Sequence, residues 1–181
     1  MNLRLALARI YVPRAKRKQK LAELFGLTAR AFNVVPPDLE GLAWCERLHE
    51  YGDYTRRLSE QALRDGLDME AIKTRLFNEA YGLGRGLALE LKLVERREVL
   101  QAARILYRGL KIDFRGDEEG RIIIQRCYFS RFYSAEGCRL MSSLDSGILA
   151  GLAGGGALEF DKRLTEGQSC CRARFYFQER D

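Results

Sequence analysis

The side chains best suited to chemistry in this sequence are cysteines, and the pattern around them places three of the five. Cys127 ends a predicted strand, Cys138 falls in the first turn of the helix predicted to follow it, and Cys171 begins an aromatic strand near the end of the chain. Side chains alternate between the two faces of a strand, so we expect Cys171 to point into the core and Cys170 to point outward. The pattern therefore brings three thiols toward one region.

Cys138 is the thiol that this arrangement would activate most. Ser134 is suited to cap the start of the predicted helix, so that unsatisfied backbone N–H groups and the helix dipole favour a thiolate at Cys138. A thiolate is a nucleophile or a metal ligand. The alternative is that all three cysteines are small buried hydrophobic side chains, as free cysteines commonly are. No C-x-x-C spacing decides between the two interpretations.

His49 is the single histidine, so a catalytic cysteine–histidine pair must include it. Cys45 precedes it by four residues, which places both side chains on one face of a predicted helix. Beside Trp44 the pair fits ordinary packing as well as catalysis, because a catalytic histidine also needs a third group to orient it.

The sequence from about residue 14 to residue 110 has the apolar periodicity of helices, interrupted at Pro36 and Pro37. Gly82 and Gly86 stand one turn apart within the longest helical stretch. No predicted strand precedes them, as a phosphate-binding loop would require. We therefore expect these two glycines to let another element pack closely.

The C-terminal half has a different period. Residues 111–114 and 121–129 read as two strands joined by the turn GDEEG, and residues 157–164 and 170–177 read as two more. An amphipathic helix that ends at glycines 154–156 separates the two pairs. The predicted fold is α+β, with a helical N-terminal half packed on a small antiparallel sheet of β-β-α-β-β order.

Charge is concentrated at the N-terminus. Residues 1–20 hold seven basic and no acidic side chains, and without these seven charges the chain's net charge of +6 becomes −1 for residues 21–181. We expect residues 1–20 to be a basic arm or first helix with little to bury, and residues 21–181 to be a single domain. No aromatic stacking platform accompanies the basic residues, so nucleic acid is not an expected partner.

The chain has no apolar run of the ~20 residues that span a bilayer, and Arg4 and Arg9 interrupt what would be the apolar region of a signal peptide. Five cysteines form no regular disulfide framework. These features favour a cytoplasmic protein with reduced thiols.

The segment RCYFSRFYSAEGCRLMSSLDSGILAGLAGGGALEFDKRLTEGQSCCRARF resembles the C-terminal core of the L-2-amino-thiazoline-4-carboxylic acid hydrolase family. The resemblance rests on a cysteine that closes a strand, a second that opens a helix ending in glycines, and a G-x-x-x-C from Gly167 to Cys171. It covers about residues 70–178, with its specific part at 126–177. The segment is also similar to the 4-vinyl reductase-type domains of bacterial sensors and pigment synthesis.

The resemblance implies ring-opening hydrolysis of a cyclic amidine or thiazoline carboxylate. Such a reaction needs an activated nucleophile, a proton donor for the leaving sulfur and a cation for the substrate carboxylate. Cys138 suits the first role, with Cys127 and Cys171 in the same site. For the remaining roles, Glu166 or Glu159 would transfer protons, and Arg126 or Arg131 would hold the carboxylate.

The related sensor domains imply a metal site as the alternative, in which cysteines bind zinc. Lys162 and Arg163 stand where a further cysteine ligand would be expected, which leaves a four-ligand site incomplete. The ligands that remain available are Cys127, Cys138, Cys171 and Glu159.

Three functions follow from these readings. The first is a hydrolase acting on a small anionic heterocycle, and the second is a non-enzymatic sensor module that binds a small molecule or a metal. The third is an interaction protein like those of trafficking complexes, which share the general fold. A large exposed apolar face and a stable homodimer would favour the third.

Overall fold

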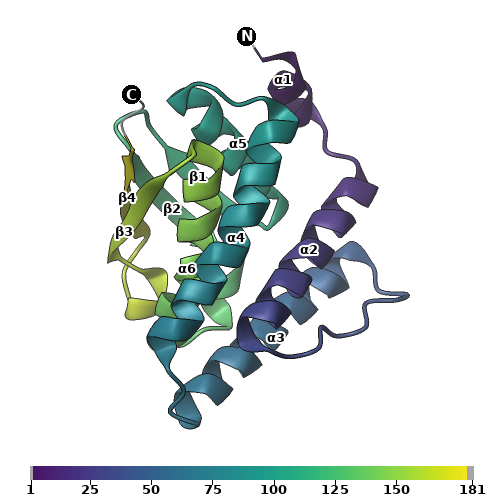
Figure 1. Cartoon of the computed structure of the whole chain (residues 1–181), viewed down its shortest axis with the longest axis vertical. Coiled ribbons are helices and arrows are strands. Elements are labelled where there is room, and N and C mark those ends of the chain that lie inside the picture. The colour runs from purple at the N-terminus through teal and green to yellow at the C-terminus, as the bar shows by residue number, and fades with distance from the viewer. Residues whose placement is uncertain (1, 179–181) are drawn as a thin grey trace.

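The computed structural model describes residues 2–178 and has an α+β architecture (Figure 1). In this part of the chain six α-helices accompany one four-stranded antiparallel sheet. The helices are α1 (Leu3–Ile10), α2 (Arg14–Phe32), α3 (Trp44–Arg64), α4 (Met69–Leu91), α5 (Arg96–Gly109) and α6 (Ala135–Ala153). The strands are β1 (Ile112–Gly116), β2 (Arg121–Cys127), β3 (Gly156–Lys162) and β4 (Cys171–Phe177), with short 3-10 helices η1 (Tyr128–Arg131) and η2 (Leu164–Glu166). The predicted fold class is confirmed.

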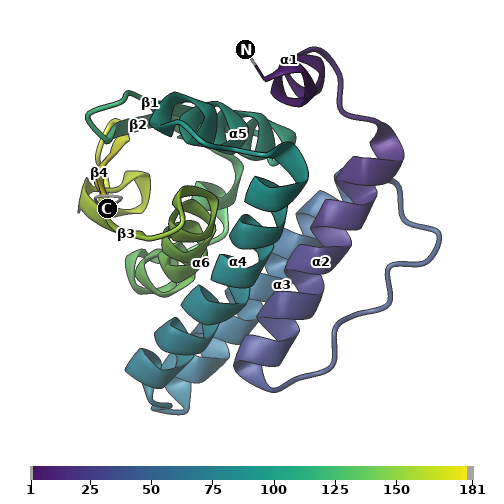
Figure 2. The same ribbon diagram turned by 45° about the horizontal axis from the view of Figure 1, so that its top comes forward.

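The elements form successive layers. The sheet packs on α5 and α6, α4 lies against α6, and α2 and α3 form the outer layer on the far side of α4 (Figure 2). α6 is the central helix, and eleven of its nineteen residues are buried. It begins at Ser134, whose hydroxyl accepts the N–H of Gly137 at 3.0 Å, and it ends at Gly154 with a φ of 82°. The predicted cap and the predicted glycine stop are both confirmed.

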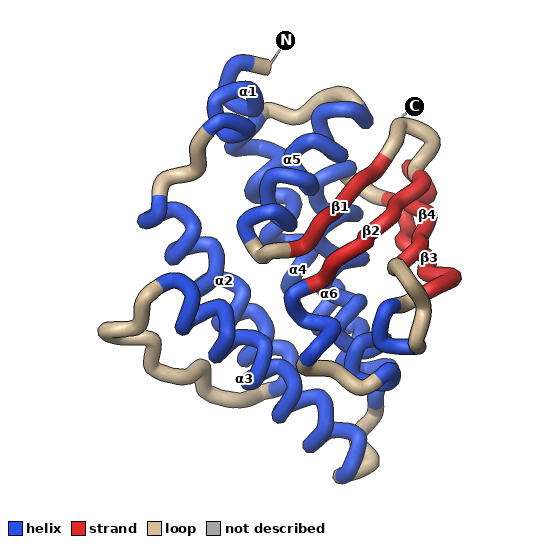
Figure 3. Tube along the Cα trace, turned by 180° about the vertical axis from the view of Figure 1, so that it is seen from behind, coloured by secondary structure: helices blue, strands red, loops and turns tan. Residues whose placement is uncertain are grey.

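The strand order β1-β2-β4-β3 leaves β1 and β3 as the two edges of the sheet (Figure 3). Alternation along β4 turns Cys171, Ala173 and Phe175 into the core and leaves Arg172 and Arg174 exposed, as predicted. The inner face therefore supplies part of the apolar core, and the outer face is largely charged.

Close packing of α4 on α6 depends on glycines. A methyl group at Gly84 of α4 would overlap the carbonyl oxygen of Ile148, and one at Gly151 of α6 would overlap the backbone of α4. Gly82 and Gly86 have open space where a side chain would stand. The predicted close contact exists, but the residues predicted to make it were wrong, because the face of α4 that meets α6 passes through Gly84.

The N-terminal segment is docked on the rest of the molecule. Residues 1–20 include α1 and the first turns of α2, and Leu5 is only 2% exposed. The amide nitrogen Nδ2 of Asn2 donates to the carbonyl of Leu91 at 2.8 Å, and Nη1 of Arg4 donates to the carbonyl of Glu90 at 2.6 Å. The expectation that this segment has little to bury is corrected, because one buried leucine in a short helix creates no sustained periodicity.

No helix within residues 2–178 is both long enough and apolar enough to cross a lipid bilayer.

Candidate functional site

The three predicted cysteines lie in one region of the interior. Cys171 is buried in β4, where its Sγ accepts the backbone N–H of Leu164 at 3.4 Å. Cys138 on α6 and Cys127 at the end of β2 are half-buried. Charge on Cys138 would raise the pKa of Cys171, and charge on Cys171 would raise the pKa of Cys127. The thiols therefore influence one another electrostatically, and their assembly into one site stays a prediction.

The electrostatic state of these thiols differs from the expectation. Burial raises the pKa of Cys127 to about 12, and burial is also the largest cause of the raised pKa of Cys138 and of Cys171. At Cys138 the loss of hydration outweighs the opposing effects, among them the positive charge of Arg163, because a thiolate is poorly solvated in the interior. All three thiols are protonated at neutral pH and are weak nucleophiles.

Asp145 is a half-buried residue, electrostatically coupled to the thiols, that the sequence analysis did not single out. It lies on α6, and the hydroxyl of Tyr107 on α5 donates to its Oδ1 at 2.8 Å. Burial raises the pKa of Asp145 to about 6. The one signal for Asp145 in the sequence is its position three residues before Ile148, which places it near the apolar face of the predicted helix.

The two predicted proton-transfer residues have other contacts. Glu166 forms an ion pair with Arg139, with its Oε1 2.7 Å from Nη2. Glu159 is exposed on the outer face of β3, opposite Arg174 of β4 in the strand register. Cys171 points to the inner face, so strand alternation separates it from Glu159.

The proposed zinc ligands are not assembled into a site. Among the side chains of residues 2–178, no three from histidine, cysteine, aspartate and glutamate are grouped so that they could hold a metal ion. Zinc binding stays a prediction from the sequence.

The remaining predicted residues are dispersed over the surface. Arg131 of η1 is exposed and its guanidinium lies 4.0 Å from the ring centre of Tyr128. Cys45 and His49 are both exposed, and the His49 ring makes an edge contact with Phe132 at 5.2 Å between ring centres. Arg126 is exposed at the end of β2 and lines a surface groove.

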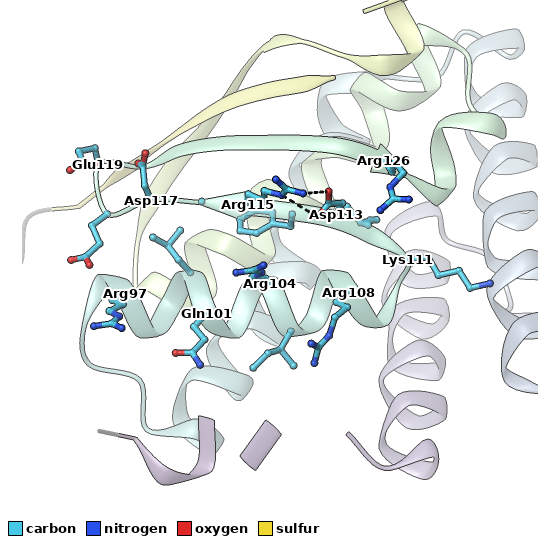
Figure 4. Close-up of a pocket in the computed structure, with 16 residues that line it drawn as sticks. Arg97, Gln101, Arg104, Arg108, Lys111, Asp113, Arg115, Asp117, Glu119 and Arg126 are labelled. Carbon is cyan, nitrogen blue, oxygen red and sulfur yellow. Dashed lines mark hydrogen bonds and ion pairs between the residues drawn. The ribbon is translucent and has the colours of Figure 1, made fainter. Parts of the chain in front are cut away.

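This groove is a large hollow beside the sheet. It runs between α5 and the free edge of β1 and has a volume of about 1230 Å³ (Figure 4). Leu100, Ile105 and Phe114 contribute apolar side chains to its lining. Its basic lining residues are Arg97, Arg104, Arg108, Lys111, Arg115 and Arg126, and its acidic ones are Asp113, Asp117, Glu118 and Glu119.

The charges of the groove are arranged along its length. Figure 4 shows Asp117 and Glu119 together at one end, in the β1–β2 turn, and Lys111 and Arg126 at the other. The carboxylates of Asp117 and Glu119 both form ion pairs with Arg121, at 2.7 and 3.3 Å. These two carboxylates therefore share the single positive charge of Arg121.

The basic side chains of the groove differ in whether they have an acidic partner. Arg115 pairs with Asp113 at 3.0 Å. No acidic partner is recorded within the described part of the chain for Arg97, Arg104 or Arg126. The groove consequently presents a surplus of unpaired positive charge to solvent.

A second surface feature also borders α5. A cavity of about 530 Å³ between α1, α2, α4 and α5 is lined largely by apolar side chains, among them Leu87 and Leu106. Ile10 and Tyr11 also line it and are 82% and 62% exposed. Exposed apolar side chains of this kind occur at surfaces that contact other proteins.

Comparison with solved structures identifies the fold. The chain is similar to the crystal structure of subunit 3 of a trafficking protein particle complex from Naegleria fowleri, covalently bound to palmitic acid. The TM-score is 0.50 at 17% sequence identity, and the match covers 75% of this chain and 99% of that chain. No family model matches this chain, and no curated protein matches it.

The resemblance to the thiazoline-carboxylate hydrolases is wrong, because a solved structure that shares the fold belongs to a trafficking-complex subunit. Hydrolysis of a cyclic thiazoline and the metal- or ligand-binding sensor function are wrong for the same reason. The motifs behind the resemblance lie at the ends of elements, where Gly154 and Gly167 adopt φ of 82° and 77°. They describe backbone turns, which one fold can retain across unrelated functions. The chain and the trafficking-complex subunit share a fold.

Proposed function

We propose that this protein is a non-catalytic subunit of a trafficking-type protein assembly and that it binds a partner polypeptide in the α5–β1 groove. The observation that supports this proposal most is the long open groove along a free strand edge, with Arg97, Arg104 and Arg126 unpaired among the described residues. The fold of a trafficking-complex subunit is consistent with such a role.

The chemistry of the interior also favours a binding role. A catalytic cysteine needs a thiolate fraction at working pH, and burial raises the pKa of Cys127, Cys138 and Cys171 instead. The groove, in contrast, is exposed and accessible without any rearrangement of the core.

The size of the groove suits a polypeptide better than the small molecule expected from the sequence. Small-molecule sites are concave, mostly apolar pockets of roughly 300–1,000 Å³ that enclose most of the ligand. This groove exceeds that range and is bordered by charged side chains. Charge along an interface mainly sets partner choice and the rate of association.

Co-purification tests the proposal. The tagged full chain is produced in the organism that encodes it and isolated at low salt, alongside the groove variant Arg104→Glu/Arg126→Glu. The matched control is Arg14→Glu/Arg64→Glu, which changes the net charge equally at two exposed positions outside the groove. A stoichiometric partner protein should accompany the wild type and the control and be lost from the groove variant. Isolation of all three proteins as single chains would contradict an assembly role.

A further inference from the structure

Resting on the proposed role as an interaction subunit, we propose that the α5–β1 groove binds an extended acidic segment of the partner protein, which adds to β1 as a fifth strand of the sheet. Strand addition to an exposed edge is a common way for domains to recognise extended peptides. Three features of the groove point to this occupant: the free backbone groups of β1, the unpaired arginines and the apolar floor.

The backbone of β1 has hydrogen-bonding groups that face the groove. The N–H of Asp117 donates to the carbonyl of Arg121 at 3.1 Å, which makes these two residues a hydrogen-bonded pair at the turn. Pairs alternate along an antiparallel ladder, so Arg115 bonds to its partner on β2, while Phe114 and Gly116 direct their N–H and C=O to the outer edge.

These outward groups are available to a partner. No other backbone or side-chain group in residues 2–178 is recorded as bonding the outward N–H or C=O of Phe114 or Gly116. The five residues of β1 offer an edge about 17 Å long, enough for a short extended segment. Backbone hydrogen bonds would fix the segment, and its side chains would decide which segment binds.

The charges of the groove select an acidic segment. Three of its four carboxylates are held in internal ion pairs, and the fourth, Glu118, lies in the β1–β2 turn. Arg104 and Arg126 have no acidic partner among the described residues. Incoming carboxylates would find these arginines without displacing an existing pair. Charge-assisted pairs between arginine and carboxylate are the stronger kind of hydrogen bond.

The floor of the groove adds a second requirement. In an added strand, alternate side chains point to opposite faces. Those on the inner face would meet Leu100 and Ile105 of α5, which favours small or branched apolar residues there. The expected sequence is therefore an alternation of acidic and apolar residues.

Two other occupants fit the charges less well. A second copy of the chain would bring another set of α5 arginines against Arg97 and Arg104, which like-charge repulsion opposes. A nucleic acid would place phosphates beside Asp117 and Glu119, and the groove has no exposed aromatic ring on which bases could stack.

Peptide binding to the purified full chain tests the proposal. The probe is a fluorescent decapeptide in which glutamate alternates with valine, followed by anisotropy at low and at moderate salt. We expect saturable binding that weakens with salt and is about tenfold or more weaker for Arg104→Glu/Arg126→Glu. Arg14→Glu/Arg64→Glu should bind like the wild type. Circular dichroism of each variant confirms that the fold is retained.

Hydrogen exchange measured by NMR decides whether the peptide adds as a strand. The amides of Phe114 and Gly116 should exchange more slowly when the peptide is bound. Two control peptides carry backbone N-methyl groups on alternate residues, one on the odd and one on the even positions. Neither control peptide should give this protection. Binding without protection of these amides would overturn the strand model.

Tighter binding of a single-stranded oligonucleotide of equal charge, or protection of the same amides by self-association, would overturn the acidic-segment model. If the acidic peptide fails while the groove variant still loses its co-purified partner, the interaction role survives and only this occupant is wrong.

Discussion

The hydroxyl of Tyr107 donates a 2.8 Å hydrogen bond to the carboxyl group of Asp145 and thereby joins α5 to α6. The Tyr107 ring also stacks on Phe114 of β1, with 5.0 Å between ring centres and 9° between ring planes. The helix that forms one wall of the groove and the strand that forms the other are thus tied to the same tyrosine. The groove is therefore built directly on the core.

The first prediction concerns the pH dependence of stability. The pKa of Asp145 rises from the ordinary 3.8 to about 6 on folding, because burial disfavours the charged form. The folded state therefore binds the proton more tightly, and this group's contribution to the free energy of unfolding is lost as pH rises from about 4 to about 6. Asp145→Asn cannot ionise and keeps an acceptor for Tyr107, so it should be more stable than the wild type at pH 7 by about 2–3 kcal/mol.

Urea unfolding of both proteins between pH 4 and pH 8 checks this expectation. The difference in stability should grow through the interval from about 4 to about 6 and then stay level. Tyr107→Phe is the companion variant, because the tyrosine hydroxyl lowers the pKa of Asp145 and its loss should raise that pKa further. A difference that does not change with pH would show that Asp145 does not titrate in this way.

The second prediction concerns the contact between α4 and α6. Gly84→Ala should lower the free energy of unfolding by about 1–3 kcal/mol, because the new methyl group meets the backbone carbonyl of Ile148, which cannot easily move. Gly82→Ala is the matched control on the same helix with open space around it, and it should raise stability by about 0.5–1 kcal/mol. Equal effects of the two variants in thermal unfolding would mean that the helices are packed differently.

The third prediction tests the docking of α1. Leu5 is 2% exposed and Leu7 is 60% exposed in the same helix. Leu5→Ala should destabilise the protein by about 2–5 kcal/mol if the surrounding core is continuous with the rest of the molecule. Leu7→Ala should change stability by less than about 0.5 kcal/mol. A detached N-terminal arm would instead tolerate both substitutions in chemical denaturation.

The fourth prediction orders the reactivity of the thiols. Iodoacetamide at neutral pH should modify exposed Cys45 before Cys127, Cys138 or Cys171, because burial keeps the latter three protonated and shielded. Peptide mass mapping over a time course gives the order. Modification of Cys138 before Cys45 would instead support the activated thiol that the sequence analysis expected.

Much of the architecture could be predicted from the sequence. Local signals are strong where one face of an element is buried, and alternation alone placed Cys171 on the buried face of β4. Cys170 lies just before β4 and is half-buried, so alternation does not decide its position. The Ser134 cap and the Gly154 stop follow from backbone chemistry within a few residues. Both features depend on contacts between residues that are close together in the sequence.

The features that were missed depend on contacts far apart in sequence. The pKa of Cys138 reflects how much protein surrounds it, and no helix-end signal reveals that burial. The choice of Gly84 over Gly82 depends on which face of α4 meets α6. The groove needs α5 beside the free edge of β1, and Arg104 and Arg126 meet there only in the folded chain.

Site-specific photocrosslinking tests the central claim, that the groove binds a partner protein, most directly. Gln101 lines the groove and Gln61 is an exposed residue of α3 outside it, so each is replaced in turn by the photoreactive residue p-benzoylphenylalanine. After irradiation in the cells that encode the chain, Gln101→p-benzoylphenylalanine should give a light-dependent covalent adduct with one partner protein, joined through an acidic segment. Gln61→p-benzoylphenylalanine should give none. Absence of an adduct at Gln101, or equal adducts at both positions, would contradict a partner in this groove.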